Sequence, residues 1–273
     1  LKSYHKFHKV FNLIFFLPIK IEKYQNNFLI DLNLSNSQLY NIPNSLNMLK
    51  ELLKKLYVSQ NKLNQLPSNL GNLLNLEVLS LNTNHLTNLP DSCAKLNKLE
   101  VLYLNDNKFK WIPNCISKEK ILSSLKTIDI CNTGLSSIPE MINKFTNLSE
   151  LNLGYNNIFF LPEEICSLKN LSRLIINNNH LTNLPENIGE LTLLEELKLR
   201  HNYLNELPES IKLLHNLKYI DLYNNEFEMA PEIIFNLPNL KGLDFEQNYF
   251  SILENKEPKR RTFPPFTFYQ PFE

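Results

Sequence analysis

The sequence predicts an α/β solenoid in which one short strand per repeat joins a parallel sheet and short helical or 3₁₀ segments cover the opposite side. Two observations predict this architecture. The heptapeptide NHLTNLP occurs at 84–90 and again at 179–185, and the offset of 95 residues is four steps of 23 with three left over. The pattern L-x-x-L-x-L-x-x-N-x-L-x-x-L-P-x-x-I-x-x-L-x-x also recurs along the chain at this 23-residue period. A fixed period of this length is typical of repeats that stack on one another.

The repeated unit occurs ten times, and its last copy is truncated after Leu253. Three extra residues fall in the unit that starts at Leu99, around Ser117–Ser124, and they explain the remainder in the spacing. The units begin at Leu29, Leu53, Leu76, Leu99, Leu125, Leu148, Leu171, Leu194, Leu217 and Leu240.

The L-x-L segment of each unit predicts a strand. It alternates apolar and polar residues, which suits a short strand with one buried face. One unit cannot bury its apolar face alone, so successive units must stack, and their strands then form a parallel sheet.

An asparagine follows eight of the ten predicted strands, in the turn that leaves the strand. Its amide can bond backbone groups that stacking removes from water, and losing such a partner costs about 1–3 kcal/mol. Ser37 and Thr133 occupy this position in the two exceptional units. We interpret the other residues as a structural asparagine ladder, formed by Asn61, Asn84, Asn107, Asn156, Asn179, Asn202, Asn225 and Asn248.

The second half of each unit predicts the outer side of the solenoid. A Leu-Pro or Ile-Pro pair recurs from Ile42-Pro43 to Leu207-Pro208 and weakens to Ala230-Pro231. Proline ends strand pairing at this point. The I-x-x-L that follows has helical spacing, which indicates a short helical or 3₁₀ turn.

These motifs resemble the leucine-rich repeat family, in its intracellular 23-residue form that carries LP-x-x-I, and the resemblance covers residues 29–253. The resemblance implies a horseshoe whose concave sheet binds a partner protein. We expect a degenerate first repeat or cap at 1–28, ten repeats at 29–253 and a C-terminal cap or tail at 254–273.

The candidate binding surface consists of the positions that point away from the predicted core, namely the third, fifth, seventh, eighth and tenth of each unit. In the later repeats these positions carry larger and more charged residues, including two of the four arginines of the chain. Tyr and Arg often dominate the binding energy of interfaces. The predicted protein-binding residues are Tyr155, Arg173, Glu196, Lys198, Arg200, His201, Tyr203, Tyr219, Asp221, Tyr223, Asp244 and Glu246.

The same residues have a second interpretation, as cross-strand pairs that satisfy the polar face of the sheet. Each such pair contributes about 0.2–1 kcal/mol. Arg173 beside Glu196, Lys198 beside Asp221 and Arg200 diagonal to Asp221 fit this interpretation. The sequence leaves both interpretations open.

Composition and motifs argue against several other functions. A formal net charge of zero and a pI near 7.2 do not favour nucleic acid or an anionic membrane as partner. The chain contains no G-x-x-x-x-G-K-S/T, G-x-S-x-G, H-E-x-x-H or C-x-x-C motif. We therefore expect no enzyme activity, no catalytic residue, no metal and no cofactor.

The cysteines predict a cytoplasmic protein with free thiols. All four lie in different repeats, without the terminal cysteine clusters of extracellular members of the resembled family. Three N-x-S/T sequons, at Asn33, Asn147 and Asn170, are expected by chance in a chain so rich in asparagine. The apolar run VFNLIFFLPI in the first 28 residues resembles part of a signal peptide, but its residues also fit the spacing of a degenerate repeat. It is too short to span a bilayer, so no membrane span is expected.

The predicted function is a non-catalytic scaffold or signalling adaptor, monomeric, that binds another protein on its concave sheet. Two alternatives stay open. One is a recognition or regulatory module of a larger enzyme, such as a kinase, cyclase or ubiquitin ligase, whose catalytic domain lies outside this segment. The other is a secreted recognition protein.

Overall fold

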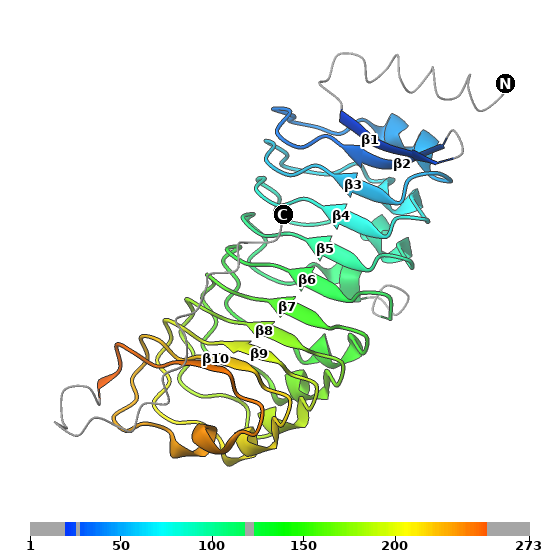
Figure 1. The fold of residues 1–273 in the computed structure, drawn as a ribbon. Helices are drawn as coiled ribbons and strands as arrows, with labels where there is room; N and C mark the ends of the chain where they lie inside the picture. Colours follow the sequence, from blue (N-terminus) through cyan, green and yellow to red (C-terminus); the bar gives the residue numbers. More distant parts are fainter. Residues whose placement is uncertain (1–19, 26–27, 118–122, 250–273) are drawn as a thin grey trace.

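In the computed structural model, which describes residues 20–25, 28–117 and 123–249, the chain forms an elongated solenoid with one strand per repeat (Figure 1). All strands of the described residues belong to one sheet, in which the spatial order equals the chain order. They are β1 (Lys20–Gln25), β2 (Phe28–Asn33), β3 (Lys55–Tyr57), β4 (Val78–Ser80), β5 (Val101–Tyr103), β6 (Thr127–Asp129), β7 (Glu150–Asn152), β8 (Arg173–Ile175), β9 (Glu196–Lys198), β10 (Tyr219–Asp221) and β11 (Gly242–Asp244).

Strands β2 to β11 run parallel, and the third residue of each unit pairs with the third residue of the next. Arg173 pairs with Glu196, for example, and Glu196 with Tyr219. The paired residues are 24 apart between Asp31 of β2 and Lys55 of β3, and the spacing widens to 26 between Val101 of β5 and Thr127 of β6. The register therefore confirms the predicted fold, the starts of the units and the three-residue insertion.

Strand β1 departs from the repeat, because it runs antiparallel to β2 with Lys20 opposite Asn33 and Gln25 opposite Phe28. Residues 20–25 thus do not pair as a repeat strand would. The remainder of the predicted N-terminal segment at 1–28, apart from Phe28 itself, and the predicted tail at 254–273 lie outside the described residues. The division of the chain at these points stays a prediction.

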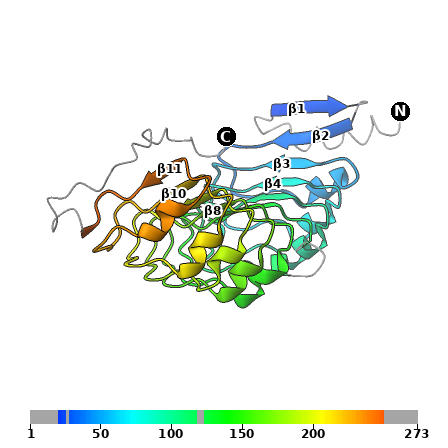
Figure 2. The ribbon, with the colours of Figure 1, turned by 60° about the horizontal axis from the view of Figure 1, so that its bottom comes forward.

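Short 3₁₀ helices line the side of the solenoid opposite the strands (Figure 2). Several start directly after the recurrent proline: the N–H of Ile165, for instance, donates to the carbonyl of Pro162 at 3.1 Å. The prediction of 3₁₀ turns is confirmed. They are η1 (Asn44–Leu49), η2 (Leu70–Asn72), η3 (Asp91–Lys95), η4 (Asn114–Ser117), η5 (Glu140–Lys144), η6 (Glu163–Ser167), η7 (Ile188–Glu190), η8 (Glu209–Leu213) and η9 (Glu232–Asn236).

The apolar positions of the repeat form one continuous core between the strands and the 3₁₀ helices. In the unit that starts at Leu171, residues Leu174, Ile176, Leu181 and Ile188 are fully buried. The core side chains of each unit pack in register on those of the next, so the core is a column of leucine and isoleucine layers.

Asparagine side chains connect successive units through the backbone. Asn179 is 4% exposed, and its Nδ2 donates to the carbonyls of Leu153, Ile176 and Asn177 at 3.0–3.2 Å. Its Oδ1 accepts the N–H of Ile158 at 3.0 Å. One amide therefore holds the turns of two repeats together. The Nδ2 groups of the other ladder asparagines likewise donate to one carbonyl of their own unit and to one of the preceding unit. These residues are Asn61, Asn84, Asn107, Asn156, Asn202, Asn225 and Asn248.

A second set of asparagines, which the sequence pattern does not reveal, precedes the strands. The Nδ2 of Asn147 donates to the carbonyl of Ser123, and that of Asn170 to the carbonyl of Thr146 at 2.8 Å. Both asparagines belong to N-x-S sequons. Backbone bonding between neighbouring units therefore gives these two residues a structural role.

Candidate binding surface

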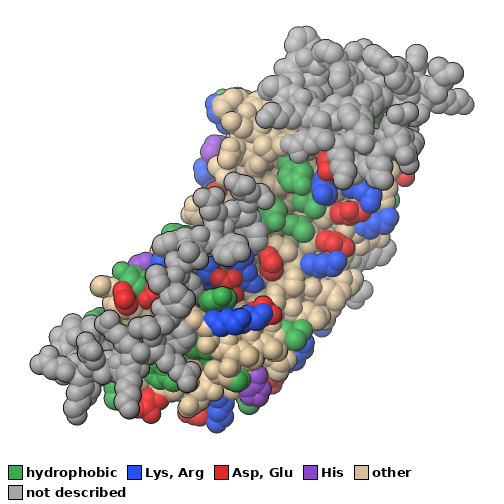
Figure 3. All heavy atoms as spheres, in the orientation of Figure 1, with side chains coloured by type: hydrophobic (Ala, Val, Ile, Leu, Met, Phe, Trp, Pro, Cys, Tyr) green, Lys and Arg blue, Asp and Glu red, His purple; other side chains and the backbone are tan. Residues whose placement is uncertain are grey.

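The strand face is the surface formed by the third, fifth and seventh positions of the units, which project from β2 to β11 away from the core. The alternation of the strand sends the fourth and sixth positions inward and leaves these positions outside. In the space-filling view, Lys and Arg side chains lie beside Asp and Glu side chains over this face (Figure 3). Positive and negative groups are mixed rather than separated.

The first charged cluster of the strand face joins β8 and β9. The guanidinium of Arg173 forms an ion pair with the carboxylate of Glu196, as predicted. Glu196 also pairs with Lys198 on its own strand, at 2.8 Å. Lys198 and Asp221 are register neighbours, as predicted, but the ion pair of Lys198 is with Glu196, two residues earlier on the same strand, rather than with Asp221.

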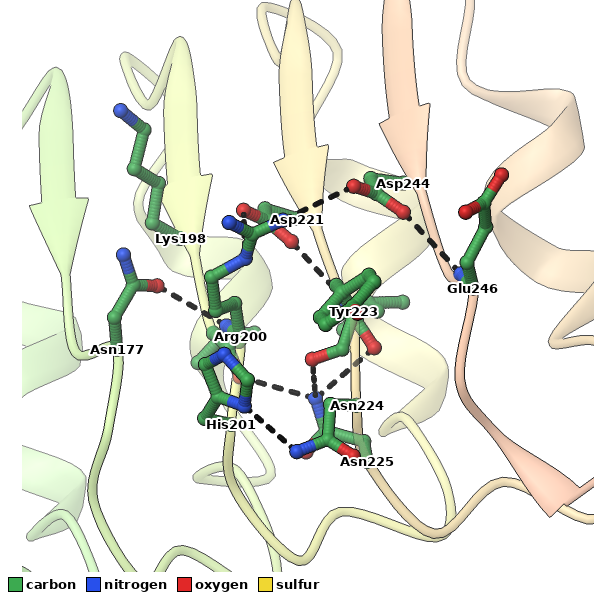
Figure 4. Close-up of polar contacts among 12 residues, drawn as sticks. Asn177, Lys198, Arg200, His201, Asp221, Tyr223, Asn224, Asn225, Asp244 and Glu246 are labelled. Carbon is green, nitrogen blue, oxygen red and sulfur yellow. Dashed lines mark hydrogen bonds and ion pairs between the residues drawn. The ribbon is translucent and has the colours of Figure 1, made fainter. Parts of the chain in front are cut away.

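The second cluster is centred on Arg200, and Figure 4 shows its contacts. The Nε of Arg200 lies 3.3 Å from the carboxylate of Asp221, and its Nη2 lies 3.2 Å from the carboxylate of Asp244. The guanidinium also lies over the ring of Tyr223, 4.5 Å from its centroid. One arginine thus contacts side chains of two further repeats, and the predicted diagonal pair with Asp221 is present.

Beside this cluster, His201 links the turns of two repeats. Its ring contacts Tyr223 edge to face, with centroids 5.5 Å apart, and its Nδ1 lies 2.6 Å from the Nδ2 of Asn224. Because these side chains belong to neighbouring turns, they limit the motion of the aromatic rings next to Arg200.

Burial raises the pKa values of two acids on this face, Asp221 and Asp129. It raises the pKa of Asp221, against the opposing effects of the N–H of Tyr223 and the charge of Arg200. Burial also raises the pKa of Asp129, on β6, from 3.8 to about 6, although the N–H of Cys131 donates to that carboxylate at 3.0 Å. For His201, burial and then the charge of Arg200 lower the pKa. Desolvation is the common cause.

Six of the predicted residues follow the strands rather than lie on them, namely Tyr155, Arg200, His201, Tyr203, Tyr223 and Glu246. Tyr155, His201 and Tyr203 follow β7 and β9, and Tyr155 and Tyr203 are 60% and 47% exposed. Tyr155 and His201 occupy a turn position that has a positive φ. This backbone conformation is uncommon for residues other than glycine and asparagine.

Next to these residues lies an exposed aromatic group that is not among the predicted binding residues. Phe159 and Phe160, in the turn after β7, are 58% and 61% exposed. The ring of His180 lies 5.0 Å from that of Phe159 and 5.8 Å from that of Tyr203. The signal in the sequence is the pair of phenylalanines at repeat positions that carry polar residues in most other units.

The described residues show neither a cation site nor a membrane helix. Within 20–25, 28–117 and 123–249, no three His, Cys, Asp or Glu side chains lie together in a way that could hold a metal ion. None of the helices in this part of the chain is long and apolar enough to cross a membrane.

Two family models match the chain. The model described as leucine-rich repeat region matches residues 120–203, and the model described as leucine rich repeat matches residues 51–109. This chain is a leucine-rich repeat protein. No curated protein matches it in sequence.

Among solved structures, this leucine-rich repeat chain is similar to three plant receptors. The ectodomain of the Arabidopsis receptor kinase HAESA, in complex with an extended IDA peptide hormone, is 27% identical with a TM-score of 0.70, over 84% of this chain and 40% of that one. PEPR1–AtPEP1 is 26% identical with a TM-score of 0.65, over 84% and 36%. The plant peptide hormone receptor RGFR1 in complex with RGF2 is 26% identical with a TM-score of 0.64, over 81% and 40%. This chain thus spans less than half the length of these receptors.

Proposed function

We propose that this leucine-rich repeat protein is a non-catalytic interaction module that binds a partner protein or peptide on its strand face, centred on β8 to β11. The observation that carries this proposal is the cluster of Arg200 with Asp221, Asp244 and Tyr223, whose ion pairs and ring contact hold partly buried polar and aromatic groups in place on the strand face. Preorganised Arg and Tyr side chains lose little entropy when a partner binds.

Both interpretations of the charges are compatible with this proposal. The ion pairs of Arg173 and Arg200 balance the charges of the strand face in the absence of a partner, which agrees with the interpretation as cross-strand pairs. The same pairs hold the side chains in place for recognition of a partner. HAESA is in complex with a peptide hormone, and RGFR1 is a peptide hormone receptor in complex with RGF2, which supports a protein or peptide as the partner here.

Affinity capture with the full chain tests the proposal. We compare the native chain with the double variant Arg200→Gln, Tyr223→Ala and quantify the captured proteins by mass spectrometry. Glutamine avoids the third negative charge that a reversal would place beside Asp221 and Asp244. The control is Lys212→Glu on η8, an exposed charge on the opposite side. We expect the double variant to lose specific partners that the control retains, and equal capture by all three chains contradicts the proposal.

We also propose that the protein is a monomeric cytoplasmic adaptor or scaffold of the intracellular LP-x-x-I type. Support comes from the cysteines, because Cys93, Cys115 and Cys166 are buried free thiols and Cys131 is a half-buried one. Imaging of the tagged protein in its own cells tests the compartment, and light scattering on the purified chain tests the monomer. A thiol titration of denatured protein that finds fewer than four reactive groups argues against a reducing compartment.

A second candidate is a recognition segment of a larger enzyme. The favouring observation is that the chain matches 40% of the HAESA chain, which is the ectodomain of a receptor kinase. Sequencing of the complete transcript separates the two candidates, because only the second requires a catalytic domain outside these 273 residues.

A further inference from the structure

Exposed aromatic side chains gather in the turns that follow β7, β8 and β9. Phe159, Phe160 and Tyr203 are 47–61% exposed, and the rings of Phe159, His180 and Tyr203 follow one another across three repeats. We call these four residues, with Glu226, the aromatic edge. It lies beside the strand face and shares no ion pair with the cluster of Arg200.

Backbone hydrogen bonds fix the spacing of the aromatic edge. The N–H of His180 donates to the carbonyl of Ile158 at 2.9 Å, and the N–H of Tyr203 donates to Leu181 at 2.8 Å. The N–H of Glu226 donates to Leu204 at 2.8 Å. Glu226 therefore follows His180 and Tyr203 at the same position of the next repeat, so a carboxylate continues the row of rings.

The aromatic side chains of this region do not serve the fold. The rings of Phe159, Phe160 and Tyr203 are about half in water, so they contribute little to the core. Neighbouring Tyr155 is 60% exposed and has a φ of +53°, where Asn132 and Asn178 stand in the adjacent repeats. A bulky side chain in this conformation lowers stability without a gain from burial. The same conformation recurs at Gln60, Thr83 and Gln247, so it belongs to the repeat, and the exposed area of the rings is the observation that indicates binding.

The charge of the edge specifies the chemistry of the partner. The turns after β9 and β10 carry Glu206, Glu226 and Glu228, and residues 201–207 and 224–230 contain no lysine or arginine. The faces of the aromatic rings also attract cations. Arginine satisfies both features, since its planar guanidinium stacks on rings and pairs with carboxylates.

We infer that the aromatic edge binds an extended segment of a partner protein that carries arginine next to apolar residues. The guanidinium lies between the ring of Tyr203 and the carboxylate of Glu226, and the apolar residues cover Phe159 and Phe160. This inference goes beyond the proposed function and does not depend on the strand face being a binding surface.

Peptide selection tests the inference. The probe is a phage-displayed library of random 12-residue peptides, selected on the immobilised full chain and then measured as synthetic peptides by fluorescence anisotropy. We expect the enriched peptides to carry arginine flanked by aliphatic or aromatic residues. Replacement of that arginine by glutamate should abolish binding.

Variants of the chain locate the site. Tyr203→Ala or Glu226→Lys should weaken these peptides by about tenfold or more. The exposed control Leu213→Ala, on η8, should not weaken them, and circular dichroism melts should show that each variant is folded. Arg200→Gln with Tyr223→Ala should leave the affinity within about twofold, because these residues lie outside the aromatic edge.

Three results overturn the inference: no enriched peptide, enriched peptides without arginine, or affinities that the two edge variants leave unchanged. Loss of binding only in the variant of Arg200 and Tyr223 overturns it too, and that result supports the proposed function of the strand face. The two proposals therefore fail separately.

Discussion

The asparagine ladder makes a quantitative prediction at Asn179. This residue is 4% exposed and bonds four backbone groups of two repeats. Asn179→Ala removes all four bonds and leaves most of the surrounding core in place. The cost then depends on which of the four backbone groups keep another partner.

The three carbonyls keep a partner and the amide does not. Leu153 still accepts from Asn156 at 2.9 Å, Ile176 from Asn202 at 2.9 Å, and Asn177 from the N–H of Tyr155 at 2.7 Å. The N–H of Ile158 loses the oxygen that it contacts in the native structure.

An unsatisfied buried N–H costs about 1–3 kcal/mol, and each of the other lost bonds adds about 0.5–1 kcal/mol. We therefore expect Asn179→Ala to lower the free energy of unfolding by about 2.5–6 kcal/mol. The matched control in the same repeat is Asn183→Ala, an exposed amide, with an expected change within about 0.5 kcal/mol.

Asn179→Asp keeps the side-chain oxygen that accepts one hydrogen bond but removes the Nδ2 group that donates the other three. Its oxygen still accepts the N–H of Ile158, but an ionised carboxylate faces three carbonyl oxygens. Burial and this repulsion raise the folded-state pKa of the new carboxyl above its unfolded value. Such a group stabilises the folded state below the unfolded pKa and loses this contribution as the pH rises through the folded pKa. Relative to the native chain, Asn179→Asp should therefore lose more stability at pH 7 than at pH 4, whereas Asn179→Ala should lose the same at both.

Urea denaturation at pH 4 and pH 7 measures the stability losses of the Ala and Asp variants. Hydrogen exchange at the Ile158 amide reports whether this N–H keeps its acceptor. We expect exchange of this amide to accelerate in Asn179→Ala and to stay slower in Asn179→Asp at low pH. A loss in Asn179→Ala no larger than in Asn183→Ala would refute the reasoning. So would equal losses in the Ala and Asp variants at every pH.

Four further predictions concern single positions. Gly189→Ala should cost about 2 kcal/mol or more in urea denaturation, because its Cβ would lie 2.0 Å from the carbonyl oxygen of Ser210. Thr83→Asn should raise stability by about 0.5–1 kcal/mol, measured as a higher Tm, because exposed Thr83 has a φ of +56°. The folded-state pKa of Asp129 is about 6, above its ordinary 3.8, so native stability should fall as the pH rises from about 4 to about 6; Asp129→Asn should flatten this part of the pH profile of the unfolding free energy. Leu174→Ala should cost about 2–5 kcal/mol as a core cavity, measured by the same urea titration.

The repeat pattern was sufficient to predict the fold. Leucine spacing placed every paired strand from β2 to β11, and the slip near Ser117–Ser124 predicted the 26-residue step between Val101 and Thr127. The pattern did not predict β1, whose antiparallel pairing with β2 has no counterpart in the repeat. Nor did the pattern include the second set of asparagines, although Asn147 and Asn170 are one period of 23 residues apart.

The candidate surface was predicted only in part. The period showed which side chains leave the core, and it gave the pairs Arg173–Glu196 and Arg200–Asp221. It did not show that Lys198 pairs with Glu196 or that Arg200 reaches Asp244. These choices depend on rotamers of long side chains, which neighbouring groups select only in the folded state.

The sequence by itself determined the unit, its number of copies, and which side chains of each unit point into the core or away from it. The reason is that a 23-residue period leaves one arrangement that buries the leucines of every unit. The tertiary structure decided which exposed groups meet. Phe159, His180 and Tyr203 are 21 and 23 residues apart in the chain, and they form one row of rings only because stacking places successive turns next to each other. Contact between side chains of different repeats depends on the exact stacking distance and on side-chain rotamers, and neither is encoded in the local pattern of one unit.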